Sequence, residues 1–127
     1  MTRPRGSDHV HATLRAVRTA PGRVRATVEV SVEPGWHVYG PDSSEGKPVA
    51  LTVDGERGHE LVNVRFPQAA DGLLSGCFEV EAELSTTDPD VTLVLAVQAC
   101  NKVICEAPGS LRLGAAVKAP DGVPGQE

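Results

Sequence analysis

The sequence has few aromatic residues and no long hydrophobic run. Only 3% of its 127 residues are aromatic, with one Trp, one Tyr and two Phe. The longest apolar stretch, Val91–Ala99, is interrupted by Thr92 and Gln98. It is much shorter than the ~20 residues that cross a bilayer as a helix. This stretch is therefore not a membrane helix.

An excess of basic residues is also missing. Twelve Lys and Arg stand against 17 Asp and Glu, so the formal net charge is -5. A negative chain repels phosphate backbones and anionic lipid, which argues against nucleic-acid binding and against direct membrane binding. Any membrane association would come through a fused domain that this chain lacks.

The two ends of the chain differ in composition from its middle. Residues 1–8 carry charges without a following apolar stretch, so this chain shows no secretory signal, and residues 118–127 are rich in Pro, Gly and polar residues, as linkers are. A domain commonly has about 100 to 150 residues. We therefore expect a piece of a longer protein, with a flexible segment 1–8, one domain at 9–117 and a linker or disordered tail at 118–127.

Alternation of apolar and polar residues is the main pattern of the chain. From Val24 to Val32 every second residue is Val or Ala, with polar residues between them. The same alternation occurs from Val10 to Ala16 and from Phe78 to Leu84, where glutamates occupy the polar positions. Period two predicts β-strands with one buried and one solvated side.

Further strands are predicted between turn residues such as Pro21-Gly22 and Pro34-Gly35. They cover residues 36–39, 49–53, 59–66, 91–99 and 111–117, and no helix of useful length is predicted. Eight or so short strands, with 18 valines and one isoleucine, indicate two antiparallel sheets packed face to face. The predicted fold is all-β, an immunoglobulin-like antiparallel β-sandwich. Its cysteines lack the spacing of the antibody inter-sheet disulfide.

Cys100 and Cys105 lie at the end of the most apolar predicted strand. If residues 101–104 form a four-residue hairpin loop, the two cysteines face each other across antiparallel strands, close enough to form a disulfide. So short a loop stabilises the fold by only about 2 kcal/mol in the chain-entropy model. A disulfide at a sheet end is also easily reached by an attacking thiolate. The spacing alone leaves both a minor staple and a redox pair open.

Three groups of residues, taken together, carry a resemblance to a known family. These are Pro34-Gly-Trp-His-Val-Tyr39, then Phe66-Pro67, then Val97-Gln-Ala-Cys100 continuing to Cys105 and Pro108. In this order they resemble the N-terminal domain of the thiol:disulfide interchange protein DsbD family, also called the disulfide bond corrector domain. The resemblance covers about Val24 to Val117.

The resemblance implies a thiol–disulfide exchange domain on the extracytoplasmic, periplasmic side of the membrane, the redox domain of a protein-disulfide reductase. Such a domain takes electrons from a thioredoxin-like protein or domain and passes them to disulfide-bonded partners, without a bound cofactor or metal. By position, Cys105 matches the cysteine that attacks and forms mixed disulfides, and Cys100 the one that resolves them. Tyr39 and His37 match positions near the pair.

The resemblance also implies a cap loop that shields the disulfide, here at residues 68–76. This stretch has no aromatic residue, so Leu73 or Leu74 is expected to shield the pair, with Asp71 as its carboxylate. A reduced Cys105 must ionise from an ordinary thiol pKa of about 8.5 before it attacks. Carboxylates such as Glu106 and Asp71 would oppose this ionisation, and Lys102 would favour it.

Two other functions remain open. One is a non-catalytic interaction module in which the cysteine pair pins a hairpin. The other is a soft-metal carrier for copper or zinc that uses Cys77, both paired cysteines and His37, since thiolates and imidazole suit these metals. Cys77 is otherwise expected to be a passive, outward-facing thiol. His9 and His11 are expected to be solvated, His59 to lie in a loop and His37 to be structural, while Trp36 should pack in the core or at its rim.

Overall fold

A computed structural model describes residues 9–41, 48–53, 60–68 and 72–119 of the chain. These residues form strands and connecting turns, without a helix. The strands are β1 Val10–Ala20, β2 Arg23–Val32, β3 His37–Tyr39, β4 Ala50–Val53, β5 Glu60–Arg65, β6 Leu73–Leu74, β7 Cys77–Ser85, β8 Asp90–Val97, β9 Ala99–Cys100 and β10 Gly109–Lys118. The described part thus contains no helix long and apolar enough to cross a membrane. Predicted residues His59 and Asp71 lie outside the described ranges, as do residues 1–8 and 120–127.

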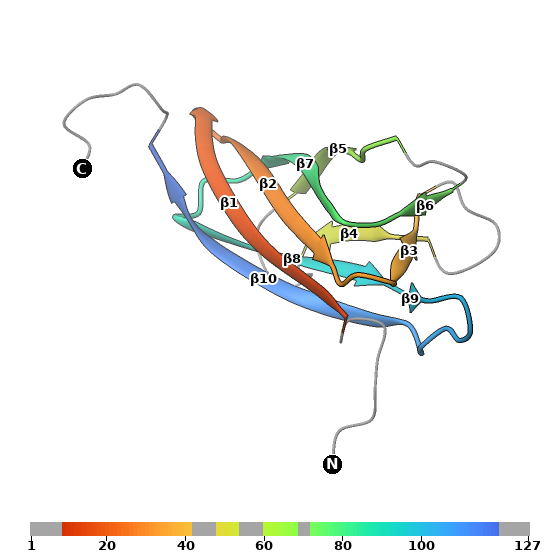
Figure 1. Cartoon of the computed structure of the whole chain (residues 1–127). Helices are drawn as coiled ribbons and strands as arrows, with labels where there is room; N and C mark the ends of the chain where they lie inside the picture. The colour runs from red at the N-terminus through yellow and green to blue at the C-terminus, as the bar shows by residue number, and fades with distance from the viewer. Residues whose placement is uncertain (1–8, 42–47, 54–59, 69–71, 120–127) are drawn as a thin grey trace, which may run out of the picture.

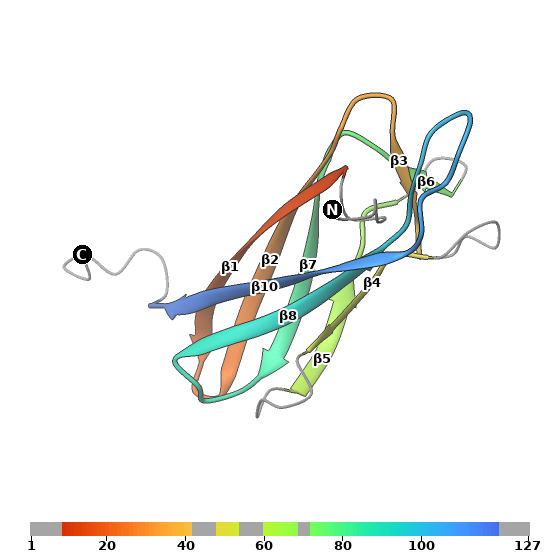
Figure 2. The same cartoon turned by 90° about the horizontal axis from the view of Figure 1, so that it is seen from below.

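The strands form two packed layers (Figure 1). One contains β1, β2, β7 and β5, and the other contains β10, β8 and β4, which run across the first layer at an angle in Figure 2. The two layers are joined at one edge because β1 pairs with β10, in the order β4-β8-β10-β1-β2-β7-β5. A separate small sheet, β6-β3-β9, lies at one end. The predicted immunoglobulin-like β-sandwich is confirmed.

One pairing differs from the predicted antiparallel arrangement. β1 and β10 are parallel, and their register covers only two pairs, Ala16 with Val117 and Val17 with Lys118. The other strand pairs are antiparallel. Parallel pairing allows β1 to leave one layer and continue the edge of the other. β10 also extends to Lys118, one residue past the domain boundary predicted at 117.

The buried side of each strand follows the predicted alternation. In β2, Val24, Ala26, Val28 and Val30 are almost completely buried, and the polar residues that alternate with them face outward. β7 and β8 contribute the largest core side chains, Leu84 and Leu95 among them. On the outer side, the glutamates of β7 form exposed ion pairs with arginines of β1, β2 and β5. Such exposed pairs add little stability. The core is therefore formed by the period-two apolar positions.

Two segments near one end differ from the prediction. The strand expected at 91–99 divides at Gln98, so that β8 ends at Val97 in the large sheet and β9 begins at Ala99 in the small one. Residues Leu73–Leu74, expected in a cap loop, form strand β6 against β3. The separate strand β9 and the short strand β6 both pair with β3, and together they form the small sheet beside the cysteine pair.

Candidate functional site

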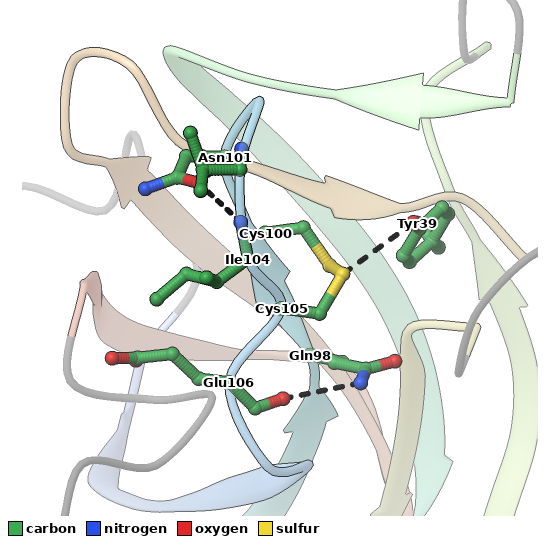
Figure 3. Close-up of a disulfide and its surroundings, with 8 residues drawn as sticks. Tyr39, Gln98, Cys100, Asn101, Ile104, Cys105 and Glu106 are labelled. Carbon is green, nitrogen blue, oxygen red and sulfur yellow. Dashed lines mark hydrogen bonds between the residues drawn. A yellow bond between two sulfur atoms is a disulfide. The ribbon is translucent and has the colours of Figure 1, made fainter.

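The cysteine pair closes a tight hairpin at the end of the small sheet (Figure 3). Cys100 and Cys105 face each other in an antiparallel bridge, and the Asn101 backbone N–H donates to the Ile104 carbonyl at 2.8 Å. The Asn101 side-chain oxygen accepts hydrogen bonds from the N–H groups of Val103 and Ile104, both at 2.8 Å. Asn favours such local turns because its short side chain reaches the backbone two or three residues further on. The predicted four-residue loop is confirmed.

The two cysteines form a disulfide, and their Cα atoms are 4.0 Å apart. They differ in access to solvent. Cys100 is only 1% exposed, whereas Cys105 is an exposed residue. An attacking thiolate must approach one sulfur along the sulfur–sulfur axis. Of the two cysteines, Cys105 is therefore the one that is open to solvent.

Sheet register decides which neighbours share a face with the disulfide. Residues directly opposite in an antiparallel pair point to the same side, and successive residues alternate. Val38 is paired with Ala99 and Leu74, and these three are buried in the core. His37 is paired with Cys100 and Tyr39 with Leu73, so these residues occupy the opposite face of the small sheet, on which Cys100 is buried and the other three are half-buried.

Tyr39 makes the direct side-chain contact with the disulfide. Its hydroxyl lies 3.8 Å from the Cys105 sulfur. The His37 ring packs edge-on against the Tyr39 ring at 5.7 Å between centroids. Leu73 is half-buried on the same face. Of the two residues expected to shield the pair, Leu74 is turned by register into the core, where it is only 6% exposed, which leaves Leu73 on the face of the disulfide.

Glu106 follows Cys105 directly and anchors the base of the hairpin. Its N–H donates to the Ala99 carbonyl at 2.9 Å, and its own carbonyl accepts a hydrogen bond from the Gln98 amide at 3.1 Å. Figure 3 shows its side chain extending away from the sulfurs. The carboxyl group is instead 3.3 Å from the His9 ring, in an ion pair whose Glu106 side chain is 8% exposed. The expected direct opposition of Glu106 to Cys105 ionisation is therefore not supported by this geometry.

His9 connects three segments that are distant in the chain. Its Nδ1 lies 2.9 Å from a Glu33 carboxylate oxygen, and its Nε2 lies 3.3 Å from Glu106. The ring stacks on Trp36, with centroids 3.8 Å apart and planes 8° from parallel. We call His9, Glu33, Trp36 and Glu106 the His9 clasp. The expectation that His9 is solvated is wrong, whereas His11 is exposed as expected and bonds to the same Glu33 carboxylate at 3.1 Å.

A tight turn places two members of the clasp. The Trp36 N–H donates to the Glu33 carbonyl at 3.0 Å, and Gly35 has a φ of 86°. A type II turn requires this positive φ at its third residue, which glycine adopts without strain and which Pro34 before it favours. The predicted Pro-Gly turn therefore brings Glu33 and Trp36 to the same side of β1, beside His9. Trp36 also packs against the core, as expected.

The clasp changes the acid–base properties of its charged members. The hydrogen bond to Glu33 raises the pKa of His9 above its usual 6.5, and the nearby Glu106 charge adds to this, while burial acts in the opposite direction. The hydrogen bonds from His9 and then His11 lower the pKa of Glu33 below its usual 4.5. A hydrogen bond to the charged form favours that form. These shifts favour the cationic form of His9 and the carboxylate form of Glu33.

Sequence reasoning missed this cluster. His9 and Glu106 lie at opposite ends of the chain, and no spacing rule connects them. The one usable signal was the Glu33-Pro-Gly-Trp36 turn, which predicts that a carboxylate and an aromatic ring lie close together. The turn does not predict that His9 is the residue that the Glu33 carboxylate and the Trp36 ring contact.

Cys77 lies apart from the pair. It is exposed on β7, in register with Ser31 of β2, and its sulfur is 3.8 Å from the Ser31 hydroxyl. In the described ranges, no three His, Cys, Asp or Glu side chains are grouped so that they could hold a metal ion. The soft-metal alternative required Cys77 beside the disulfide, so these coordinates contradict it.

No family model and no curated protein matches the sequence. Among solved structures, the chain is similar to the N-terminal periplasmic domain of ScsB from Proteus mirabilis, with a TM-score of 0.62 and 22% identity. This match covers 89% of the chain and 49% of that structure, so the chain spans about half of its length.

Two further solved structures are similar to the chain. The GAE domain of yeast GGA1 has a TM-score of 0.53 and 19% identity over 84% of this chain and 93% of that one. The N-terminal domain of Neisseria meningitidis DsbD, in its reduced form, has a TM-score of 0.43 and 14% identity over 87% and 86%. At such identities the similarity supports the β-sandwich fold only.

Proposed function

We propose that the chain is a thiol–disulfide exchange domain that passes electrons between a thioredoxin-like donor and disulfide-bonded partner proteins through Cys100 and Cys105. The observation that carries the proposal is the disulfide at the end of the small sheet, with one sulfur accessible and the other buried. Access to a single sulfur gives each exchange step a defined order. The motif resemblance to the DsbD family supports the same role.

Reduction begins at the exposed sulfur. A partner thiolate attacks the Cys105 sulfur, the Cys100–Cys105 bond breaks, and the bonding electron pair leaves on Cys100 as a thiolate, which takes up a proton. The partner's second cysteine, as a thiolate, then attacks the sulfur of the partner's first cysteine in the mixed disulfide. Cys105 is released as a thiolate. The net result is that the partner dithiol becomes a disulfide and the chain's disulfide becomes a dithiol.

Transfer onward reverses the roles. The Cys105 thiolate attacks a disulfide of the next protein and forms a mixed disulfide with it. Cys100, held within bonding reach across the hairpin, attacks the Cys105 sulfur, reforms the internal disulfide and releases the reduced partner. The Tyr39 hydroxyl beside Cys105 is placed to donate a hydrogen bond to its thiolate, which would favour ionisation.

The setting of the domain is part of the proposal. Disulfides persist in oxidising compartments and are rare in reducing ones. The fold similarity to a domain described as periplasmic supports an extracytoplasmic location. The proposed partners are a thioredoxin-like protein or domain and substrate proteins with disulfides, and the exchange itself needs no bound cofactor.

The experiment uses the chain with a Cys77→Ser change, so that only the pair reacts. The oxidised protein is mixed with reduced thioredoxin, and the redox state of the pair is followed by alkylation and mass spectrometry. We expect reversible exchange and a potential within the range of thiol–disulfide oxidoreductases, about -120 to -270 mV.

A pair that small thiols reduce but thioredoxin does not would contradict the proposal. It would support the interaction module with a hairpin-pinning disulfide instead. The β-sandwich fold by itself does not choose between these functions.

A further inference from the structure

Large hydrophobic side chains are exposed at a few positions on the surface. In the described part of the chain they are Val103 at 87% exposure, Ile104 at 54% and Val62 at 46%. Single exposed hydrophobic residues are ordinary on protein surfaces. Val103 and Ile104, however, are neighbours in the hairpin loop, and Ile104 immediately precedes Cys105. We call these two side chains the apolar tip.

The hairpin holds the apolar tip in place. The Asn101 side chain accepts hydrogen bonds from the N–H groups of both tip residues, and the disulfide closes the loop at its base. The Ile104 carbonyl is bonded back to Asn101 as well. A surface that is already ordered loses little conformational entropy when a partner binds. The loop is thus built to present its apolar side chains outward.

The geometry of a mixed disulfide brings a partner near this tip. The Cα atoms of two disulfide-bonded cysteines lie about 4.4 to 6.8 Å apart. The Ile104 Cα is one peptide unit, about 3.8 Å, from that of Cys105. A partner protein bonded to Cys105 therefore lies close to the hairpin loop, and the Ile104 side chain extends from the side of the hairpin away from the sulfurs (Figure 3).

The charges near the tip favour an apolar contact. Lys102 is the exposed charged residue in the loop, whereas the Glu106 carboxylate extends away from the sulfurs and is paired with His9. A charged partner surface would lose water against Val103 and Ile104 without gaining hydrogen bonds. An apolar surface would instead gain from burial.

We propose that the apolar tip is the docking surface for the redox partner, a thioredoxin-like protein with an apolar surface beside its reactive cysteine. This inference rests on the proposed exchange function. It assigns partner recognition to Val103 and Ile104, which react with nothing themselves. The tip lowers the free energy of the encounter complex before the sulfurs react.

The test compares a protein thiol with a small one. A Val103→Ser, Ile104→Ser variant is prepared in the Cys77→Ser protein, and Val62→Ser on β5 serves as the matched control. Reduction of each oxidised protein is timed with reduced thioredoxin and with dithiothreitol. Val103→Ser alone gives a second, milder variant.

We expect the double variant to react about tenfold more slowly with thioredoxin, the effect of losing buried apolar contact from two side chains. Its rate with dithiothreitol should stay within about twofold, because a small thiol needs no docking surface. Val62→Ser should match the parent protein with both reductants, and Val103→Ser should fall between.

Two results would overturn the inference: an unchanged rate with thioredoxin, or an equal loss with both reductants, which would indicate a change in the pair rather than in docking. If thioredoxin fails to reduce even the parent protein while dithiothreitol succeeds, the proposed exchange function itself fails. The two failures are therefore distinguishable.

Discussion

At the scale of single residues, Cys100 and Cys105 differ in access to solvent although they are bonded to each other. Cys100 is in β9 and is in register with His37 of β3, with the core beneath it. Cys105 is on the returning arm of the hairpin and is exposed. Thiol reactivity depends on access as well as on ionisation. Burial therefore distinguishes Cys105, which we propose attacks, from Cys100, which we propose resolves the mixed disulfide.

This difference can be measured with single-thiol proteins. In the Cys77→Ser background, Cys100→Ser leaves Cys105 free and Cys105→Ser leaves Cys100 free. We expect iodoacetamide to modify Cys100 on the order of a hundredfold more slowly, because it reacts only after local opening of the structure. Rates are followed by mass spectrometry at pH 8, and a denatured sample of each protein provides the control. Equal rates in the folded proteins would contradict the assignment of roles.

At the scale of elements, the proposed exchange requires the hairpin to keep its shape in both redox states. It is anchored without the disulfide by the Asn101 hydrogen bonds and by the Glu106 backbone, which bonds to Ala99 and Gln98. A redox domain needs such anchors, since its disulfide is broken in every cycle. A hairpin whose disulfide served mainly as a staple would not need these additional hydrogen bonds.

Reduction should therefore cost little stability. For so short a loop, the chain-entropy model gives about 2 kcal/mol for the loss of the bond. We expect the reduced protein to remain folded, with an unfolding free energy about 2 kcal/mol or less below the oxidised form. Urea titration with and without a phosphine reductant measures this. Complete unfolding on reduction would argue for a structural disulfide.

The His9 clasp should make stability depend on pH in a defined direction. Its His9 pKa is raised, so this contribution is complete below pH 6.5 and is lost as the pH rises through the raised value. The Glu33 pKa is lowered, so its contribution is complete above pH 4.5 and is lost as the pH falls through the lowered value. Both contributions are present together between these limits.

Urea midpoints at pH 6 and pH 8 test the His9 part. The parent protein should lose more stability across this interval than His9→Gln does, because the variant has no imidazole to deprotonate. Glu33→Gln removes the largest cause of the raised His9 pKa and should also reduce the pH dependence. If His9→Gln keeps the full pH dependence of the parent, the clasp does not contribute as described.

At the scale of the whole molecule, stability and reactivity depend on different parts. The large-sheet layers supply most of the core, whereas the small sheet and its hairpin carry the disulfide. Leu84 of β7 is fully buried in the sandwich and makes no contact with the disulfide that the structure records. Changes in the core should therefore affect folding before they affect chemistry.

Leu84→Ala tests this separation. Deleting a buried leucine side chain costs about 2–5 kcal/mol, because a cavity remains in a packed core. We expect a loss of this size in urea titration, together with a rate of reduction by dithiothreitol within about twofold of the parent under folding conditions. A much slower or faster reaction in the folded variant would show that the site depends on the sandwich core.

The strands with long alternating patterns were predictable because burial of every second residue is a local property. Val24–Val32 and Phe78–Leu84 are examples, and the loop between the cysteines followed from its length. The two-residue strand Leu73–Leu74 was not predictable, since so short a segment has no period. The break at Gln98 was missed because an apolar run does not show where a chain leaves one sheet for another.

The sequence by itself determined the all-β class, the apolar faces and the closeness of Cys100 to Cys105, since these depend on residues near one another in the chain. Only the tertiary structure decided that Cys100 is buried and Cys105 exposed, that Leu74 faces the core, and that His9 reaches Glu106. These features arise where segments distant in the chain pack together. Local patterning constrains which residues are buried but not which distant residues they meet.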